Sequence, residues 1–139
     1  MSASDASREL LRAASLRVTD GRLALLDQMA TSAGPVSLDE MLELCGDAAG
    51  DRATVYRNLQ AFSRVGLISL VRGLGKRDLY EIASRHADHP EHAHAVCVEC
   101  GRVECVDVHG KLPATPAQSG WGPITASLTY WGVCGECRE

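Results

Sequence analysis

Residues 92–101 read HAHAVCVECG, and residues 134–137, near the end of the chain, read CGEC. The two CxxC pairs, Cys97 with Cys100 and Cys134 with Cys137, supply four thiols that two tight turns can aim at one ion. Such a set is typical of a tetrahedral structural zinc. We therefore predict one structural Zn²⁺ per chain. The alternatives are four unrelated cysteines or a rubredoxin-like iron site.

Two histidines stand just before the first cysteine pair. His92 and His94 are two residues apart in a β-type run, so both are expected on one face of a strand. Further along, in GRVECVDV, alternation places Val103, Cys105 and Asp107 on a common side. Imidazoles with a nearby thiolate could hold a second metal ion, whereas a short histidine-rich stretch is also typical of a solvated loop.

The composition limits the class of protein. The chain has 139 residues, 45% of them hydrophobic, which is enough for a packed core. No apolar run approaches the roughly 18 residues of a membrane span, and the first ten residues do not resemble a signal peptide. We therefore expect a cytoplasmic protein, in which cysteine pairs are metal ligands rather than disulfides.

The two halves differ in charge. Residues 1–80 carry ten basic and ten acidic side chains, whereas residues 81–139 carry four basic and eight acidic ones. All five histidines and five of the six cysteines also lie in the second half. This contrast predicts two chemically distinct regions with a boundary near residue 82.

The first half has the pattern of short helices followed by a hairpin. Apolar spacing predicts helices over residues 9–18, 19–34, 37–46 and from about Asp51 to 66. Ser37 with Glu40 forms a capping-box signature, and Asp51 is a suitable N-cap. Alternating apolar residues over 67–82, around a turn at Gly73–Gly75, predict a β-hairpin.

That order of elements is typical of a winged helix-turn-helix domain, so the predicted fold class is α+β. On the fourth helix Val55, Leu59 and Phe62 form the buried stripe. The side chains facing elsewhere suit a recognition helix: Arg52, Thr54, Tyr56, Arg57 and Gln60. Three cations at the hairpin tip could contact the DNA backbone: Arg72, Lys76 and Arg77. The alternative is a small helical domain with ordinary solvated charges, since this half is not net basic.

Three segments together resemble the ferric uptake regulator (Fur) family of bacterial metal-responsive repressors. They are TVYRNL (54–59), HAHAVCVECG (92–101) and WGVCGEC (131–137), and the resemblance extends over about residues 9–137. It implies a winged-helix DNA-binding domain over 1–81, a hinge over 82–91 and a small, mostly β, α/β dimerisation domain over 92–139. It also implies a homodimer that binds an AT-rich inverted repeat in double-stranded DNA.

The resemblance assigns roles to individual residues. Tyr56 is expected to read bases, Arg57 to bind phosphate and Arg17 to help hold the DNA. The predicted DNA-binding set is completed by Arg52, Thr54 and Lys76. A separate regulatory metal site is implied at Glu81, His92, His94 and Cys105.

The sequence departs from the family pattern in three places. Cys105 stands where many members carry an acid. Pro35 stands where many carry a histidine, and the first half contains no histidine. The segment that is usually a helix in the dimerisation domain contains Pro113 and Pro116, so no regular helix is expected there.

The predicted function is a metal-dependent transcriptional repressor of metal-homeostasis genes. Its cofactors would be a structural Zn²⁺ and a second divalent ion, Fe²⁺, Mn²⁺ or Zn²⁺, as regulator. The alternatives are a peroxide-sensing repressor of the same family and a zinc-ribbon interaction module without a DNA role. An enzyme using His92, His94 and Cys105 is not expected, because no motif such as HExxH supplies a general base.

Overall fold

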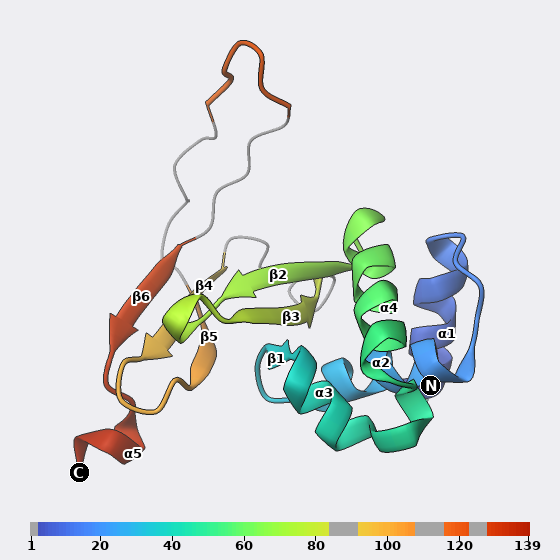
Figure 1. Cartoon of the computed structure of the whole chain (residues 1–139). Coiled ribbons are helices and arrows are strands. Elements are labelled where there is room, and N and C mark those ends of the chain that lie inside the picture. The colour runs from blue at the N-terminus through green and yellow to red at the C-terminus, as the bar shows by residue number, and fades with distance from the viewer. Residues whose placement is uncertain (1–2, 84–91, 108–115, 123–127) are drawn as a thin grey trace. The chain divides into compact units, whose positions relative to one another are not determined.

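The structure is a computed structural model and describes residues 3–83, 92–107, 116–122 and 128–139 (Figure 1). The chain divides into two compact units, Met1–Ala87 and Asp88–Glu139, and each is considered by itself. None of the helices in the described residues is both long and apolar enough to cross a membrane.

The first unit opens with helices that pack on one another. Their bounds are α1 Ala3–Ala13, α2 Asp20–Thr31, α3 Leu38–Cys45 and α4 Arg52–Arg64, with a 3₁₀ turn, η1, over Gly46–Ala49. The predicted third and fourth helices are confirmed. The first helix was predicted over residues 9–18 but begins at Ala3 and ends at Ala13, and the second ends at Thr31, before the predicted Gly34.

Side chains cap these helices where the sequence predicted. The Ser37 hydroxyl accepts from the Glu40 amide at 3.1 Å at the start of α3, and Asp51 accepts from the Thr54 amide at 2.8 Å at the start of α4. Because the Thr54 amide donates to this carboxylate, the pKa of Asp51 is lowered. A cap of this kind stabilises a helix by about 1 kcal/mol, so the start of α4 is well defined.

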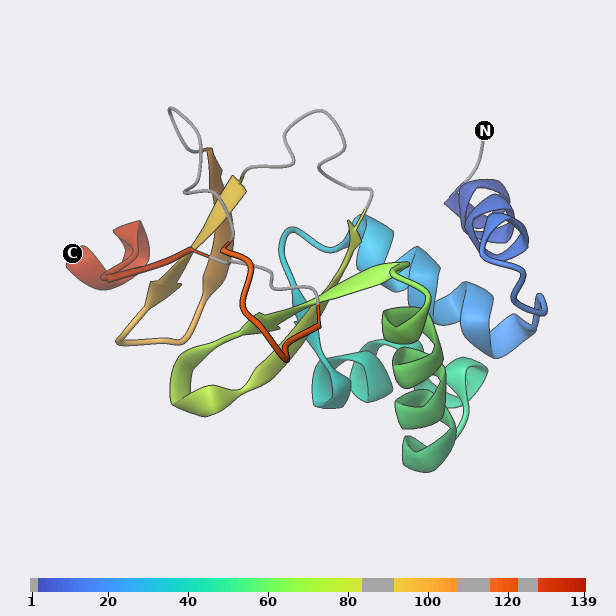
Figure 2. The same cartoon turned by 90° about the horizontal axis from the view of Figure 1, so that it is seen from above.

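A three-stranded antiparallel sheet completes the unit. The hairpin strands β2 (Ile68–Arg72) and β3 (Asp78–Ile82) are joined through a 3₁₀ turn, η2 (Leu74–Lys76), and the short β1 (Val36–Ser37) pairs with β3, giving the order β1-β3-β2. Seen from above, the hairpin projects away from the helices (Figure 2). The predicted winged helix-turn-helix arrangement is confirmed.

The core of the first unit lies between the helices and the base of this sheet. The side chains of Val55, Leu59 and Phe62 on α4 are fully buried, as the apolar stripe predicted. They pack with residues from every other helix and from β2 and β3, including Leu11, Leu25, Met29, Met41, Ile68 and Tyr80. Truncating a buried phenylalanine in such a core costs about 3–5 kcal/mol, so this unit is stabilised mainly by apolar packing.

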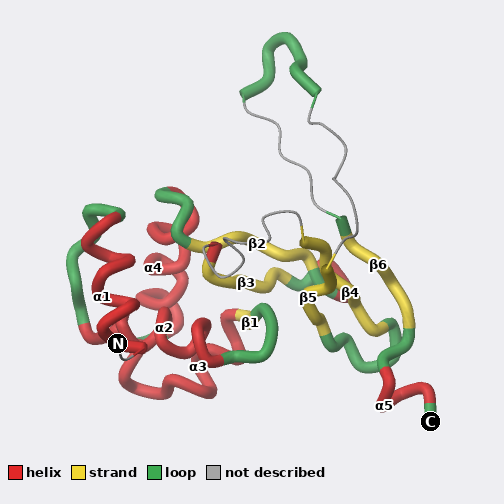
Figure 3. The backbone as a smooth tube through the Cα atoms, turned by 180° about the vertical axis from the view of Figure 1, so that it is seen from behind, coloured by secondary structure: helices red, strands yellow, loops and turns green. Residues whose placement is uncertain are grey.

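The second unit is a small sheet followed by one helical turn. Its strands are β4 (His92–Cys97), β5 (Val103–Asp107) and β6 (Thr129–Gly132), and α5 (Gly135–Arg138) closes the chain (Figure 3). The order is β5-β4-β6, with β4 antiparallel to β5 and parallel to β6. The segment around Pro113, where no regular helix was predicted, lies outside the described residues.

Candidate metal centre and nucleic-acid interface

Four cysteines meet at the end of the second unit. The sulfurs of Cys97, Cys100, Cys134 and Cys137 all lie within 4.8 Å of one another, and the Cys100 and Cys134 sulfurs are 3.8 Å apart. Thiolates held about 2.3 Å from one zinc in a tetrahedron stand about 3.8 Å apart. The four donors therefore fit a tetrahedral ion without rearrangement of the backbone.

The strand register brings the two cysteine pairs together. In the parallel β4–β6 ladder Cys97 lies opposite Gly132, and the Val98 amide donates to the Gly132 carbonyl at 2.8 Å. The chain then needs only two residues beyond β6 to reach Cys134. On the other side, Gly101 adopts a φ of +79°, which favours glycine, and its amide donates to the Cys97 carbonyl to close the first turn.

Hydrogen bonds shift the pKa values of two of the four thiols, Cys97 and Cys137, in opposite directions. The Cys134 amide donates to the Cys97 sulfur at 3.3 Å, and this bond, with that of the Cys100 amide, lowers the pKa of Cys97 to about 6. In contrast, hydrogen bonds with Cys134 and Cys100 raise the pKa of the Cys137 thiol to about 12.

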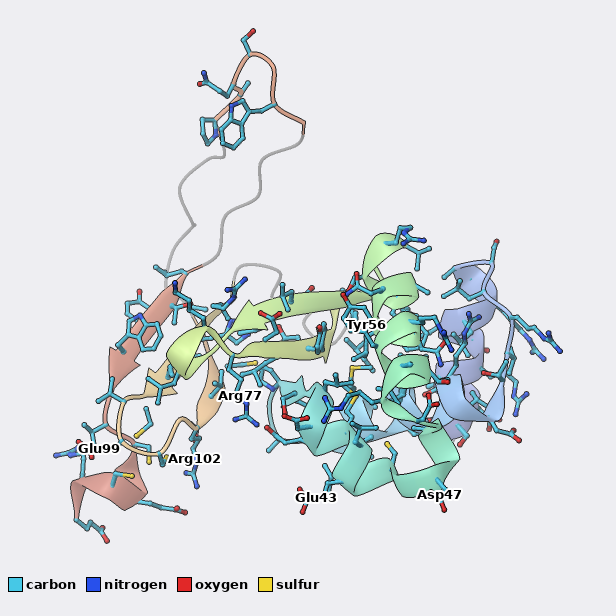
Figure 4. The ribbon with its side chains drawn as sticks, in the orientation of Figure 1. Glu43, Asp47, Tyr56, Arg77, Glu99 and Arg102 are labelled. Atoms are coloured by element: carbon cyan, nitrogen blue, oxygen red, sulfur yellow. The ribbon has the colours of Figure 1, made fainter. Side chains whose placement is uncertain are left out.

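Arg102 joins the two cysteine turns, a role that the sequence did not indicate. Its guanidinium lies 2.9 Å from the carboxylate of Glu136, which precedes Cys137 in the sequence, and 3.5 Å from that of Glu104. Figure 4 labels Arg102 on its strand-to-strand turn. Its carbonyl accepts from the Cys97 amide at 2.9 Å. The ion pairs are partly exposed and each is worth at most about 1 kcal/mol, so Arg102 orients the turns rather than holding them alone.

A second group of possible ligands lies on β4 and β5. His94 is opposite Cys105 in the antiparallel register, and a ring nitrogen of His94 and the Cys105 sulfur lie within 4.8 Å of each other. His92 pairs with Asp107 in the same register, but its side chain is outside the described part. Glu81 belongs to the first unit, on β3 opposite Ser69.

The outer face of α4 carries the predicted recognition residues. Tyr56 is 51% exposed, which is high for an aromatic ring on a helix that is otherwise anchored in the core (Figure 4). Arg52 and Arg57 are exposed and Thr54 is half-buried, and Arg17 is exposed before α2. Arg52 pairs with Asp39 at 2.5 Å, a surface ion pair worth about 0–1 kcal/mol, so a phosphate could displace the aspartate.

The three cations predicted at the hairpin tip differ in their ion pairing within the protein. Arg72 pairs with Asp78 at 3.2 Å, and Arg77 donates to Glu40 at 2.6 Å and to the Ser37 hydroxyl at 2.9 Å. Arg77 therefore ties the hairpin to the start of α3 instead of extending from the tip. Lys76 is exposed, and within the described part of the chain no ion pair involves it.

The comparisons with known proteins agree on one family. The model of the ferric uptake regulator family matches residues 13–129. The transcriptional regulator FurA of Mycobacterium tuberculosis is 35% identical over 135 residues, covering 93% of this chain and 88% of FurA. That relative is a transcriptional regulator, in agreement with the expectation that the chain is not an enzyme.

Solved structures share the fold. The ferric uptake regulator of Helicobacter pylori aligns with a TM-score of 0.68 at 18% identity, over 99% of this chain and 92% of its own. That of Vibrio cholerae aligns with a TM-score of 0.64 at 23% identity, over 91% and 98%. At these identities the likeness establishes the fold alone.

Proposed function

The chain belongs to the ferric uptake regulator family, and on this premise we propose that it is a homodimeric repressor that binds a palindromic, AT-rich operator when a divalent metal ion is bound. The observation that carries the proposal is the presence of two separate ligand groups in the second unit. One is the four-cysteine cluster, and the other is His94 with Cys105. A protein that needed zinc only for folding would require only the first.

We assign the four-cysteine cluster to a structural Zn²⁺. Four protein ligands leave no open position, which suits a folding role and not catalysis. When bound, the ion would supply four metal–sulfur bonds, and this chain's own residues orient the ligands. The Cys134 amide holds the Cys97 thiolate, and Arg102 holds the second turn through Glu136.

Zinc retention should fall as the pH falls, because protons compete with the ion for every sulfur ligand. The pKa of Cys97, lowered to about 6, keeps this thiolate available to an ion at neutral pH, whereas the Cys137 thiol, whose pKa is raised to about 12, must lose a proton when the ion binds. Protein loaded with one zinc should therefore keep it against a weak chelator at pH 7 and lose it progressively as the pH is lowered. Release can be followed with a colorimetric zinc indicator, with Cys45→Ser as the control. Zinc release that does not increase as the pH is lowered would contradict binding by thiolates.

We place the regulatory site at Glu81, His92, His94 and Cys105. The His94–Cys105 register supports the assignment of those two ligands. Glu81 alternates along β3 with Tyr80 and Ile82, which belong to the helix-packed core, so its side chain is on the other face of the sheet. An ion bound by all four ligands would join the first unit to the second.

Such an ion acts as a switch only through its preference for one arrangement of the two units. A coupling free energy of about 1–3 kcal/mol would change DNA affinity roughly 5- to 150-fold. The thiolate of Cys105 favours a soft-tolerant ion such as Zn²⁺, whereas cellular availability also admits Fe²⁺ or Mn²⁺. The metal would then determine the affinity of the dimer for its operator. The residues proposed to contact the DNA are Arg17, Arg52, Thr54, Tyr56, Arg57 and Lys76.

The decisive experiment is a metal titration read out as DNA affinity. Protein already holding its structural zinc is titrated with Mn²⁺, Fe²⁺ under anaerobic conditions, and additional Zn²⁺. Wild type is expected to gain at least about fivefold in affinity for an AT-rich palindrome with one of them. His94→Ala and Cys105→Ser should lose that response and retain their basal affinity.

Cys45→Ser is the matched control for Cys105→Ser. Cys45 lies in the first unit, where its thiol contacts the Ala24 carbonyl at 3.6 Å, outside both ligand groups. Metal-independent DNA binding in wild type, or an unchanged response in both ligand variants, would reject the regulatory site. If iron-loaded protein loses DNA affinity after hydrogen peroxide, the peroxide-sensing alternative is favoured. Absence of DNA binding under every condition favours the interaction module.

A further inference from the structure

Arg22, in the first turn of α2, joins two segments that flank it in space. Its Nε donates to the Asn58 side-chain oxygen on α4 at 3.0 Å, and its Nη1 donates to the Arg17 carbonyl at 2.9 Å. Its backbone amide donates to the Thr19 hydroxyl, the N-cap of α2. One half-buried side chain therefore links the loop before α2 to the recognition helix, and its partner Asn58 is 36 positions away from it in the sequence.

The linked segments form the sides of a surface groove of about 490 Å³. Its lining includes Arg17, Thr19 and Arg22 on one side and Thr54 and Asn58 on the other, with Asp47 as an acidic member. Gly21 and Ala49, which also line the groove, are closely packed, because a Cβ on Gly21 would lie 3.2 Å from the Ala49 carbonyl oxygen. Among the described contacts, the hydrogen bonds of Arg22 are those that connect the Arg17 loop to α4.

We propose that Arg22 is a positioning residue for DNA binding: it fixes the Arg17 loop against the recognition helix so that both meet the operator as one preformed surface. The inference rests on the proposed function. Two guanidinium nitrogens, Nε and Nη1, donate to two different segments of the protein, so the planar group with several fixed donors matters more than its charge. Prior ordering of the loop removes a cost that binding would otherwise carry.

A positioning role and a direct phosphate contact give different salt dependence. A side chain that neutralises one phosphate contributes about 0.9 to the slope of log affinity against log salt. Arg22→Gln and Arg22→Lys are both expected to weaken operator binding roughly tenfold while leaving that slope unchanged. Lysine keeps the charge and lacks the fork, so it should not rescue.

The Asn58 partner provides a double-mutant cycle. Asn58→Ala removes the acceptor on α4, and the double variant with Arg22→Gln should bind no worse than Arg22→Gln alone. Arg64→Gln, at the C-terminal end of α4, is the control for loss of one charge. A second readout needs no DNA: amide hydrogen exchange of residues 16–19 in the free protein should accelerate in Arg22→Gln and Asn58→Ala but not in Arg64→Gln.

The positioning role would be overturned if Arg22→Lys restored full operator affinity, or if Arg22→Gln reduced the salt slope by about 0.9 per chain. It would also be overturned if the losses of Arg22→Gln and Asn58→Ala added in the double variant, or if the exchange of residues 16–19 did not change. Failure of the wild type to bind DNA would instead reject the proposed function. The exchange measurement would still decide whether Arg22 orders the Arg17 loop.

Discussion

Replacing Cys134 with serine should abolish the proposed zinc site and unfold the second unit. Among the described residues of that unit, the buried apolar side chains are only Ala93, Val96 and Cys97. Five large apolar side chains there are exposed: Val98, Trp121, Tyr130, Trp131 and Val133. The few buried apolar side chains in the described part of this unit stabilise it little by themselves, and structural zinc supplies about 10–16 kcal/mol in small domains.

Cys134 supplies one of the four sulfurs, and a serine hydroxyl is a poor substitute for a thiolate ligand of zinc. Cys134 is also the N-cap residue of α5, and its amide donates to the Cys97 sulfur, so loss of the ion should loosen the turn that holds Cys137 and its link to the first cysteine pair. We expect zinc content to fall from one per chain to near zero, with loss of the β signal in circular dichroism and loss of the proposed dimer.

The measurement combines metal analysis, circular dichroism and sedimentation. Cys45→Ser serves as the matched control, because it removes a thiol from the first unit and should change none of the three. The first unit should stay folded in both variants, since its core is apolar and contains no cysteine ligand. A Cys134→Ser protein that stays dimeric with full zinc content would refute the structural role.

The parts of the fold that the sequence predicted correctly are those determined by local chemistry. Ser37 and Asp51 cap α3 and α4 through hydrogen bonds to residues three positions ahead, so both helix starts could be identified from neighbouring residues. The spacing of Val55, Leu59 and Phe62 predicted the buried face of α4. The paired CxxC motifs likewise predicted a cluster, because each pair is confined to one turn.

The errors in the helix bounds arise where other contacts decide the outcome. The earlier start of α1 is stabilised by Ser4 and Ser7, whose hydroxyls donate to the Asp27 carboxylate on α2 at 2.7 and 2.6 Å. The earlier end of α2 comes at Ser32, whose backbone turns extended (ψ 146°) and whose hydroxyl donates to the Gln28 carbonyl at 2.8 Å. Neither arrangement has a signature in a linear pattern.

The partners of the charged side chains could not be predicted from the sequence either. In the sequence Arg77 and Lys76 are both cations at the predicted hairpin tip. In the fold, however, Arg77 pairs with Glu40, which is 37 positions away. No linear pattern marks Arg22 or Arg102, because their partners, Asn58 and Glu136, are brought close only by packing. Composition and spacing locate candidate cations, and tertiary structure decides which of them are already engaged.

Replacing Tyr56 or Arg57 with alanine should weaken DNA binding in two different ways. Tyr56 is half-exposed on α4, one residue after the fully buried Val55, so its backbone is anchored while its ring faces outward. A ring in the major groove meets base edges, and its removal should weaken operator binding by about 1–3 kcal/mol with much less effect on random DNA. Preference for the palindrome should therefore collapse.

Arg57 should act on every sequence alike. It is exposed, and its guanidinium lies 3.5 Å from the Thr54 hydroxyl, which is too long for a strong hydrogen bond and leaves the group available to a phosphate. Arg57→Ala should reduce affinity for operator and random DNA by a similar factor. It should also reduce the salt slope by about 0.9 for each phosphate that the arginine neutralises in the wild type.

Fluorescence anisotropy at several salt concentrations, with metal saturating, measures both the affinity and the salt slope for operator and random DNA. Arg64→Gln is the charge control, because it removes one cation from the end of α4 farthest from Tyr56 and Arg57 and should leave the preference for the operator intact. If Tyr56→Ala weakens both DNAs equally, or Arg57→Ala leaves the slope unchanged, α4 does not present these two side chains to base and phosphate as proposed.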